Sequence, residues 1–163
     1  MQLTVRRVER AAEASGTAQA AAVRDRAVAI AGRTLVPLPP SPLPDKLYAA
    51  IDGTGVPVTS KENAGRDGKG ADGRARTREV KLAVFFTRDA LDDTGYPVRG
   101  PGSSSDIATL EPAAAFSGLV KAEGVRRGAD HVRQFTILGD GAPWICYPDV
   151  GIADLIPVPR LSR

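Results

Sequence analysis

Two short apolar runs in this chain end in aspartate and glycine, and both predict strands. Residues 47–51 (LYAAI) lead into Asp52-Gly53, and residues 135–138 (FTIL) lead into Gly139-Asp140-Gly141. Short runs of strand-forming residues closed by turn residues are typical of buried strands. Each strand would therefore present a carboxylate at its carboxyl end. An aspartate-glycine pair taken alone is more often an ordinary turn, so a simple loop remains the alternative for each.

The residues between these runs continue the strand pattern. The first strand is expected to resume at residues 56–58 and to form a long hairpin with residues 77–87, where side chains alternate along the chain. Glycines and prolines make residues 92–105 a turn-rich stretch. A third strand is predicted at residues 106–110.

A helix is predicted between the third strand and the second aspartate strand. Pro112 suits a helix start, and Phe116, Leu119 and Val120 recur at helical spacing. The helix should run to about Arg127, with Gly128 as its C-terminal glycine. A strand at residues 132–138 follows, so the expected order is strand, strand, strand, helix, strand, which is a mixed α/β pattern.

Composition changes abruptly outside this region. Residues 1–36 are rich in helix formers and predict a helical arm, in two pieces broken at Ser15-Gly16. The arginines of this arm are expected on a solvent-exposed helix face, and contact with DNA is the alternative. Five prolines make residues 37–45 a polyproline-like linker. The folded domain is expected at 46–145, and 146–163 is expected to be an irregular tail.

Overall composition excludes only a few classes of function. The chain has 163 residues, 42% of them hydrophobic, which allows one compact domain, and its net charge of +3 favours an anionic partner. One cysteine and one histidine leave no disulfide framework and no Cys/His zinc site, so any metal must be held by oxygen. No apolar run reaches the roughly 18 residues needed to cross a bilayer. We therefore expect a cytoplasmic protein without a membrane partner.

Two features of the sequence suggest a metal site and a nucleic-acid contact. If the two aspartate strands are neighbours, Asp52 and Asp140 come together, and paired carboxylates suit a two-metal site holding Mg²⁺ or Mn²⁺. Basic residues outnumber acidic ones between residues 61 and 81, where glycines free the backbone to follow a phosphate chain. The candidate DNA contacts are Lys61, Arg66, Lys69, Arg74, Arg76, Arg78 and Lys81. The alternative is a solvated hairpin tip.

The order of elements is similar to that of the ribonuclease H-like fold, and three motifs resemble one family within it. Residues 48–57 (YAAIDGTGVP), 74–81 (RARTREVK) and 138–145 (LGDGAPWI) closely resemble bacterial DDE transposases from insertion sequences of the Kra type. The resemblance runs from about Pro39 to Ile145. Three ordered motifs are far more specific than any one of them.

The resemblance implies a transposase catalytic domain that cuts and joins DNA at transposon ends with two divalent ions. Asp52 and Asp140 take the places of the first two acids of the family's catalytic triad. Transposon ends and target DNA are the implied partners, and a homo-oligomer is possible. Trp144, just past Asp140, is expected to anchor the core.

The resemblance stops after Ile145. The third acid of the family lies well beyond the second, and Asp149 and Asp154 are poor substitutes because prolines interrupt the sequence around them. We therefore expect an incomplete ribonuclease H-like sheet in a truncated or frameshifted chain that is catalytically inactive. The alternative is a non-catalytic DNA-binding remnant or a regulator of a transposable element.

Overall fold

The computed structural model describes residues 4–68 and 71–146. The chain divides into two compact units, Met1–Pro37 and Leu38–Arg163. The expected tail lies almost entirely outside the described residues, because only Cys146 belongs to an element of the structure.

The first unit contains one long helix, α1, at Val5–Ala31. The break expected at Ser15-Gly16 is wrong, because the helix runs through both residues. A glycine costs a helix only about 1 kcal/mol relative to alanine, and alanines on both sides favour the helix. The helix ends at Gly32, whose N–H donates to the carbonyl of Val28 (2.8 Å). None of the residues of α1 is buried.

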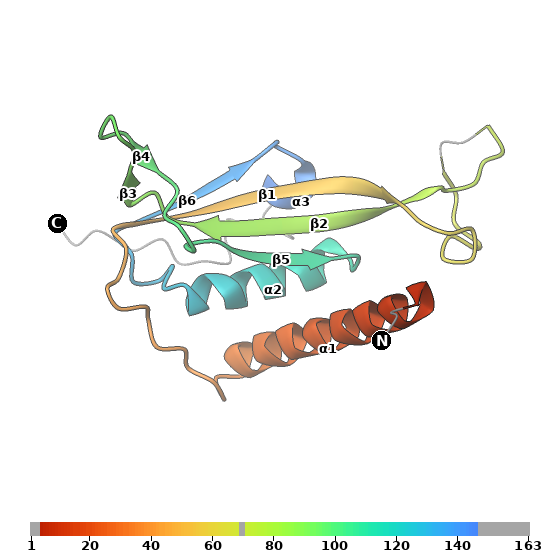
Figure 1. The fold of residues 1–163 in the computed structure, drawn as a ribbon, viewed down its shortest axis with the longest axis horizontal. Coiled ribbons are helices and arrows are strands. Elements are labelled where there is room, and N and C mark those ends of the chain that lie inside the picture. The colour runs from red at the N-terminus through yellow and green to blue at the C-terminus, as the bar shows by residue number, and fades with distance from the viewer. Residues whose placement is uncertain (1–3, 69–70, 147–163) are drawn as a thin grey trace. The chain divides into compact units, whose positions relative to one another are not determined.

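The second unit is built on a mixed four-stranded sheet (Figure 1). Its strands are β1 (Lys46–Pro57), β2 (Thr77–Phe86), β5 (Ser105–Thr109) and β6 (Gln134–Gly139), in the order β5-β2-β1-β6. The central hairpin of β1 and β2 is antiparallel, β5 adds antiparallel to β2, and β6 lies parallel to β1. The expected α/β architecture is confirmed at this level.

One face of the sheet holds the core. The helix α2 (Ala113–Arg126) packs against β2 and β5, and its Phe116 and Val120 are fully buried. Leu47, Ala49, Ile51, Ala83 and Phe85 from β1 and β2 are buried at this face as well. We call it the covered face. Gly128, just past α2, has φ +79, so the expected C-terminal glycine is confirmed.

The alternate side chains of β1 and β2 point to the opposite side, which we call the open face. Ala50, Leu82 and Val84 lie there and are only half-buried. Leu138 of β6 is 47% exposed. The short helix α3 (Pro143–Cys146) lies on the covered face, because Trp144 meets Phe116 there with ring centroids 5.8 Å apart.

Regular structure that the sequence did not predict lies within the turn-rich stretch and just before it. Two strands of two residues each, β3 (Ala90–Leu91) and β4 (Pro97–Val98), form a small second sheet. Asp92 organises the turn between them, since its carboxylate accepts hydrogen bonds from Thr94 and from the N–H of Tyr96. The first strand also differs from expectation, because β1 continues without interruption through Gly53-Thr54-Gly55.

Candidate metal and nucleic-acid site

The parallel pairing of β1 and β6 leads directly to Asp52, in the middle of β1, and to Asp140, the residue after β6. The last paired residues are Ile51 and Gly139, and the two aspartates come next. Adjacent strands lie about 4.8 Å apart, and equivalent residues of parallel strands point to the same face. The alternation along β1 puts Asp52 on the open face. The sheet therefore brings the two predicted site residues together.

Local hydrogen bonds hold one oxygen of each carboxylate. The Oδ1 atom of Asp52 accepts from the N–H of Gly53 (2.7 Å), and that of Asp140 accepts from the N–H of Ala142 (2.9 Å). Gly141 has φ +82, which gives the turn after Asp140 its shape. Both aspartates are exposed, and within the described residues their Oδ2 atoms accept no hydrogen bond. Two free carboxylate oxygens are the donors that hard cations such as Mg²⁺ prefer.

The pair lacks a third acid in the described part of the chain. Among residues 4–68 and 71–146, no three His, Cys, Asp or Glu side chains form a group that could hold a metal ion. Asp149 and Asp154, the two substitutes considered from the sequence, lie outside the described residues.

The helix α3 ties the turn after Asp140 to the strand that carries Asp52. A Cβ atom on Gly53 would lie 3.2 Å from Cζ2 of Trp144 and 2.9 Å from Oε1 of Glu79. Ile145 is buried and would lie 3.2 Å from a Cβ on Gly139. Glycine at 53 and 139 therefore allows α3 to sit directly on the sheet. The expectation that Trp144 anchors the core agrees with its contact to Phe116.

Lys81 lies in this packed region and differs from the other basic residues. Its side chain is only 9% exposed, its Nζ atom is 2.6 Å from Oε2 of Glu79, and it lies 5.8 Å from the centre of the Trp144 ring. Alternation along β2 puts Lys81 on the covered face. We therefore remove Lys81 from the predicted DNA-contacting set, because its charge is already paired and little of its surface reaches solvent. The sequence offered no signal for this burial, because alternation along β2 does not show which face a helix covers.

The remaining basic residues lie on the loop between β1 and β2 and at the start of β2. We call residues 58–78 the basic hairpin, which extends beyond the end of the sheet (Figure 1). Lys61, Arg66, Arg74 and Arg76 are exposed, and Arg78 is half-buried. Lys69 lies outside the described residues.

Acidic residues of the basic hairpin are mostly engaged within it. Glu62 accepts hydrogen bonds from the side chain and the N–H of Thr59, which lower its pKa. The N–H of Arg74 and the side chain of Arg76 lower the pKa of Asp72. Within the described residues, Lys61, Arg66 and Arg74 form no ion pair. Their charges are therefore available to an anionic partner.

Asn63 is a residue of the basic hairpin that sequence reasoning missed. It is 6% exposed, and neither polar atom of its amide has a hydrogen-bond partner within the described residues. A buried unpaired amide costs about 1 to 3 kcal/mol. An isolated asparagine in a polar loop gives no sequence signal for such burial.

Comparison of the chain with protein-family models, with curated proteins and with solved structures finds no match. In the described ranges, no helix combines the length and the apolar character needed to cross a membrane.

Proposed function

We propose that this chain carries part of the catalytic domain of a DDE transposase with a ribonuclease H-like fold. The observation that carries the proposal is the register of β1 and β6, two parallel neighbours that end their pairing immediately before Asp52 and Asp140. The strand order β5-β2-β1-β6 supports it, because the first aspartate strand lies between its hairpin partner and the second aspartate strand. The three motifs that resemble the transposase family contain both aspartates.

The proposed reaction is metal-dependent cleavage and transfer of DNA strands at transposon ends. Asp52 and Asp140 would hold Mg²⁺ or Mn²⁺ through the oxygens that the backbone leaves free. The ions, when bound, activate a water or a 3′-hydroxyl and stabilise the charge that develops in an in-line displacement. The exposed cations of the basic hairpin would hold the phosphates of the DNA beside the sheet. No side chain of the protein is required as a nucleophile.

The donor set fits a hard cation but is small. Mg²⁺ demands near-octahedral geometry, and two carboxylates fix that geometry poorly without a further ligand. The purified 163-residue chain is therefore expected to bind Mn²⁺ weakly and to cleave no transposon-end DNA.

Metal binding tests the proposal directly. We expect Asp52→Asn and Asp140→Asn each to weaken Mn²⁺ binding by about tenfold or more, as measured by calorimetric titration, since loss of a supporting residue alone commonly costs ten- to a hundredfold. Asp106→Asn is the matched control, because Asp106 is an exposed aspartate of β5 on the same open face. Equal Mn²⁺ affinity in all three variants would refute the shared site.

Mn²⁺ binding separates this proposal from its alternative, because neither expects this chain to cleave DNA. The alternative is a non-catalytic DNA-binding remnant or regulator, and it is favoured by the lack of a third acid near the pair within the described residues. DNA binding without Mn²⁺ binding would support it. Turnover that disappears in Asp52→Ala would contradict the expected inactivity and make Asp149 and Asp154 the next acids to change.

A further inference from the structure

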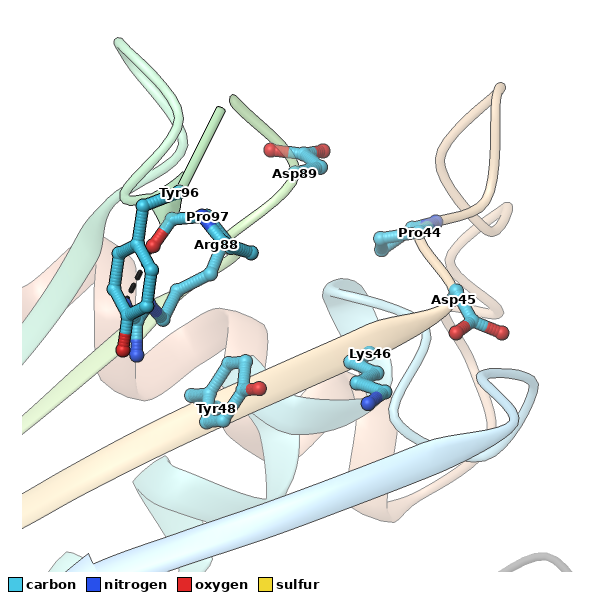
Figure 2. Close-up of a pocket in the computed structure, with 8 residues that line it drawn as sticks. All are labelled: Pro44, Asp45, Lys46, Tyr48, Arg88, Asp89, Tyr96 and Pro97. Carbon is cyan, nitrogen blue, oxygen red and sulfur yellow. Dashed lines mark hydrogen bonds between the residues drawn. The ribbon is translucent and has the colours of Figure 1, made fainter. Parts of the chain in front are cut away.

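A pocket of about 360 Å³ lies at the end of the sheet where β1 begins (Figure 2). Its walls come from the start of β1, from the segment after β2 and from the β3-β4 hairpin. The polar and aromatic residues that line it are Asp45, Lys46, Tyr48, Arg88, Asp89 and Tyr96, and two prolines complete the wall. Tyr48 precedes Asp52 by four residues on the same face of β1, about 13 Å along the strand. The pocket is therefore distinct from the aspartate pair but opens on the same face.

Two tyrosine rings give the pocket flat apolar surfaces. Tyr48 stacks on Phe86 with ring centroids 5.3 Å apart and planes inclined by 12°, and Arg99 lies over Phe86 at 4.2 Å. This stack holds the Tyr48 ring in place. Tyr96 is 61% exposed, and the guanidinium of Arg88 lies 5.5 Å from the centre of its ring. Aromatic rings held beside arginine are typical surfaces for stacking a nucleobase.

The charges at the pocket are unequally engaged. Asp45 forms two hydrogen bonds with Arg133 (2.6 and 2.9 Å), and Arg133 lowers the pKa of this carboxyl. Asp89 accepts a hydrogen bond from the hydroxyl of Thr87 (2.7 Å). In contrast, Lys46 forms no ion pair within the described residues.

Most N–H groups of the Arg88 guanidinium form no hydrogen bond within the described residues. One of its N–H groups donates to the carbonyl of Pro97 (2.5 Å), which holds the side chain along the pocket wall (Figure 2). A guanidinium has five N–H donors, and within the described residues only this one is hydrogen-bonded, so the others are open to a ligand. Lys46 and Arg88 therefore offer positive charge beside the two tyrosine rings.

We propose that this pocket binds a single unstacked nucleotide, with its base against Tyr48 and Tyr96 and its 5′-phosphate near Lys46 and Arg88. The ligand class follows from the combination of flat rings and free cations, since neither feature alone would select a base joined to a phosphate. The site uses neither the aspartate pair nor the basic hairpin. The pocket proposal therefore does not depend on the proposed transposase activity.

Calorimetric titration of the full chain with 5′-dAMP tests the pocket. We expect saturable binding of dAMP, and weaker binding of both deoxyadenosine and inorganic phosphate, because each of these lacks one half of the recognised group. Tyr96→Ala should weaken dAMP binding by about five- to 150-fold, the range for loss of one base-stacking ring, whereas Tyr96→Phe should bind as the parent does. Circular dichroism of each variant confirms that the fold is retained.

Variants elsewhere supply the controls. Lys121→Ala changes an exposed lysine of α2 and should leave dAMP binding unchanged, while Lys46→Ala should weaken it. The proposal is overturned if dAMP does not bind, if phosphate binds as tightly as dAMP, or if Tyr96→Ala has no effect. Loss of Mn²⁺ binding in Asp52→Asn with intact dAMP binding would show that the two sites are independent.

Discussion

The two faces of the four-stranded sheet differ in what their residues do. The covered face buries Leu47, Ile51 and Phe85 beneath α2, so its side chains hold the fold together. The open face carries half-buried small and aliphatic residues together with Asp52 and the mouth of the pocket. Because neighbouring residues of a strand point to opposite faces, residues that stabilise the fold alternate along the strand with residues that face the candidate site. A substitution at one position and at its neighbour should therefore have different consequences.

The largest expected difference is in stability. Phe85→Ala removes a fully buried ring from the covered face and should lower the free energy of unfolding by about 3 to 5 kcal/mol. Val84→Ala, one residue earlier on the open face, should cost about 1 kcal/mol, since its side chain is only half-buried. Urea denaturation measures both. Equal losses would mean that the open face is packed in solution.

DNA binding should distinguish the basic hairpin from the covered face. If Arg74, Arg76 and Arg78 each contact a phosphate, changing all three to Ala should flatten the dependence of log affinity on log salt by about 2.7, or about 0.9 per contact. The control is Lys81→Met, which should leave the slope unchanged because Lys81 is paired on the covered face. Fluorescence polarisation with duplex DNA over a salt series gives the slopes. An unaltered slope in the triple variant would mean that these arginines face solvent and do not contact DNA phosphates.

The effect of Lys81→Met should instead be seen in the environment of Trp144 on the covered face. Trp144 is the chain's single tryptophan, and the ammonium of Lys81 lies over its ring. Removing that charge should shift the fluorescence emission of the protein and change its stability by about 1 kcal/mol or less, roughly the strength of a cation-π contact. Arg76→Met, in the exposed hairpin, is the matched control. An emission spectrum identical to that of the parent would argue against this packing.

The smallest expected effect lies beside the pocket, at the ion pair of Asp45 and Arg133. Arg133 lowers the pKa of Asp45 in the folded protein. The pair therefore adds stability above the ordinary carboxyl pKa of about 3.9, and this stability is lost as pH falls through the lower folded value. Arg133→Gln should return the pKa of Asp45 toward its ordinary value, as followed by NMR titration. Both side chains are exposed, so the change in unfolding should be slight.

The elements with a strong local signal were predictable from the sequence. Alternation marked β2, and helical spacing and Gly128 marked α2. The two apolar runs marked strands that the structure places side by side, but only β6 ends at its aspartate-glycine motif, because β1 continues past Asp52 to Pro57. Alternation divides β2 into two faces, but it does not say which face a helix will cover. Val80, Leu82 and Val84 suggest a core by composition, yet Ala83 and Phe85 are the more deeply buried residues.

The missed features depend on contacts between distant segments. The pocket joins the start of β1, at Lys46, to the β3-β4 hairpin, which begins only at Ala90. The burial of Lys81 requires Trp144, which lies far away in the chain. The uninterrupted α1 shows the opposite error, since a local rule about glycine was given too much weight against its alanine neighbours.

The packing of Trp144 beside Gly53 has a consequence for how the two carboxylates are spaced. The residue after Asp52 has no side chain, and the carboxylate of Glu79 and the indole of Trp144 fill the space that one would occupy. This contact braces the turn that carries Asp140 against the strand that carries Asp52. Side-chain packing within the fold therefore helps to fix the spacing of Asp52 and Asp140, which the proposed metal site would need.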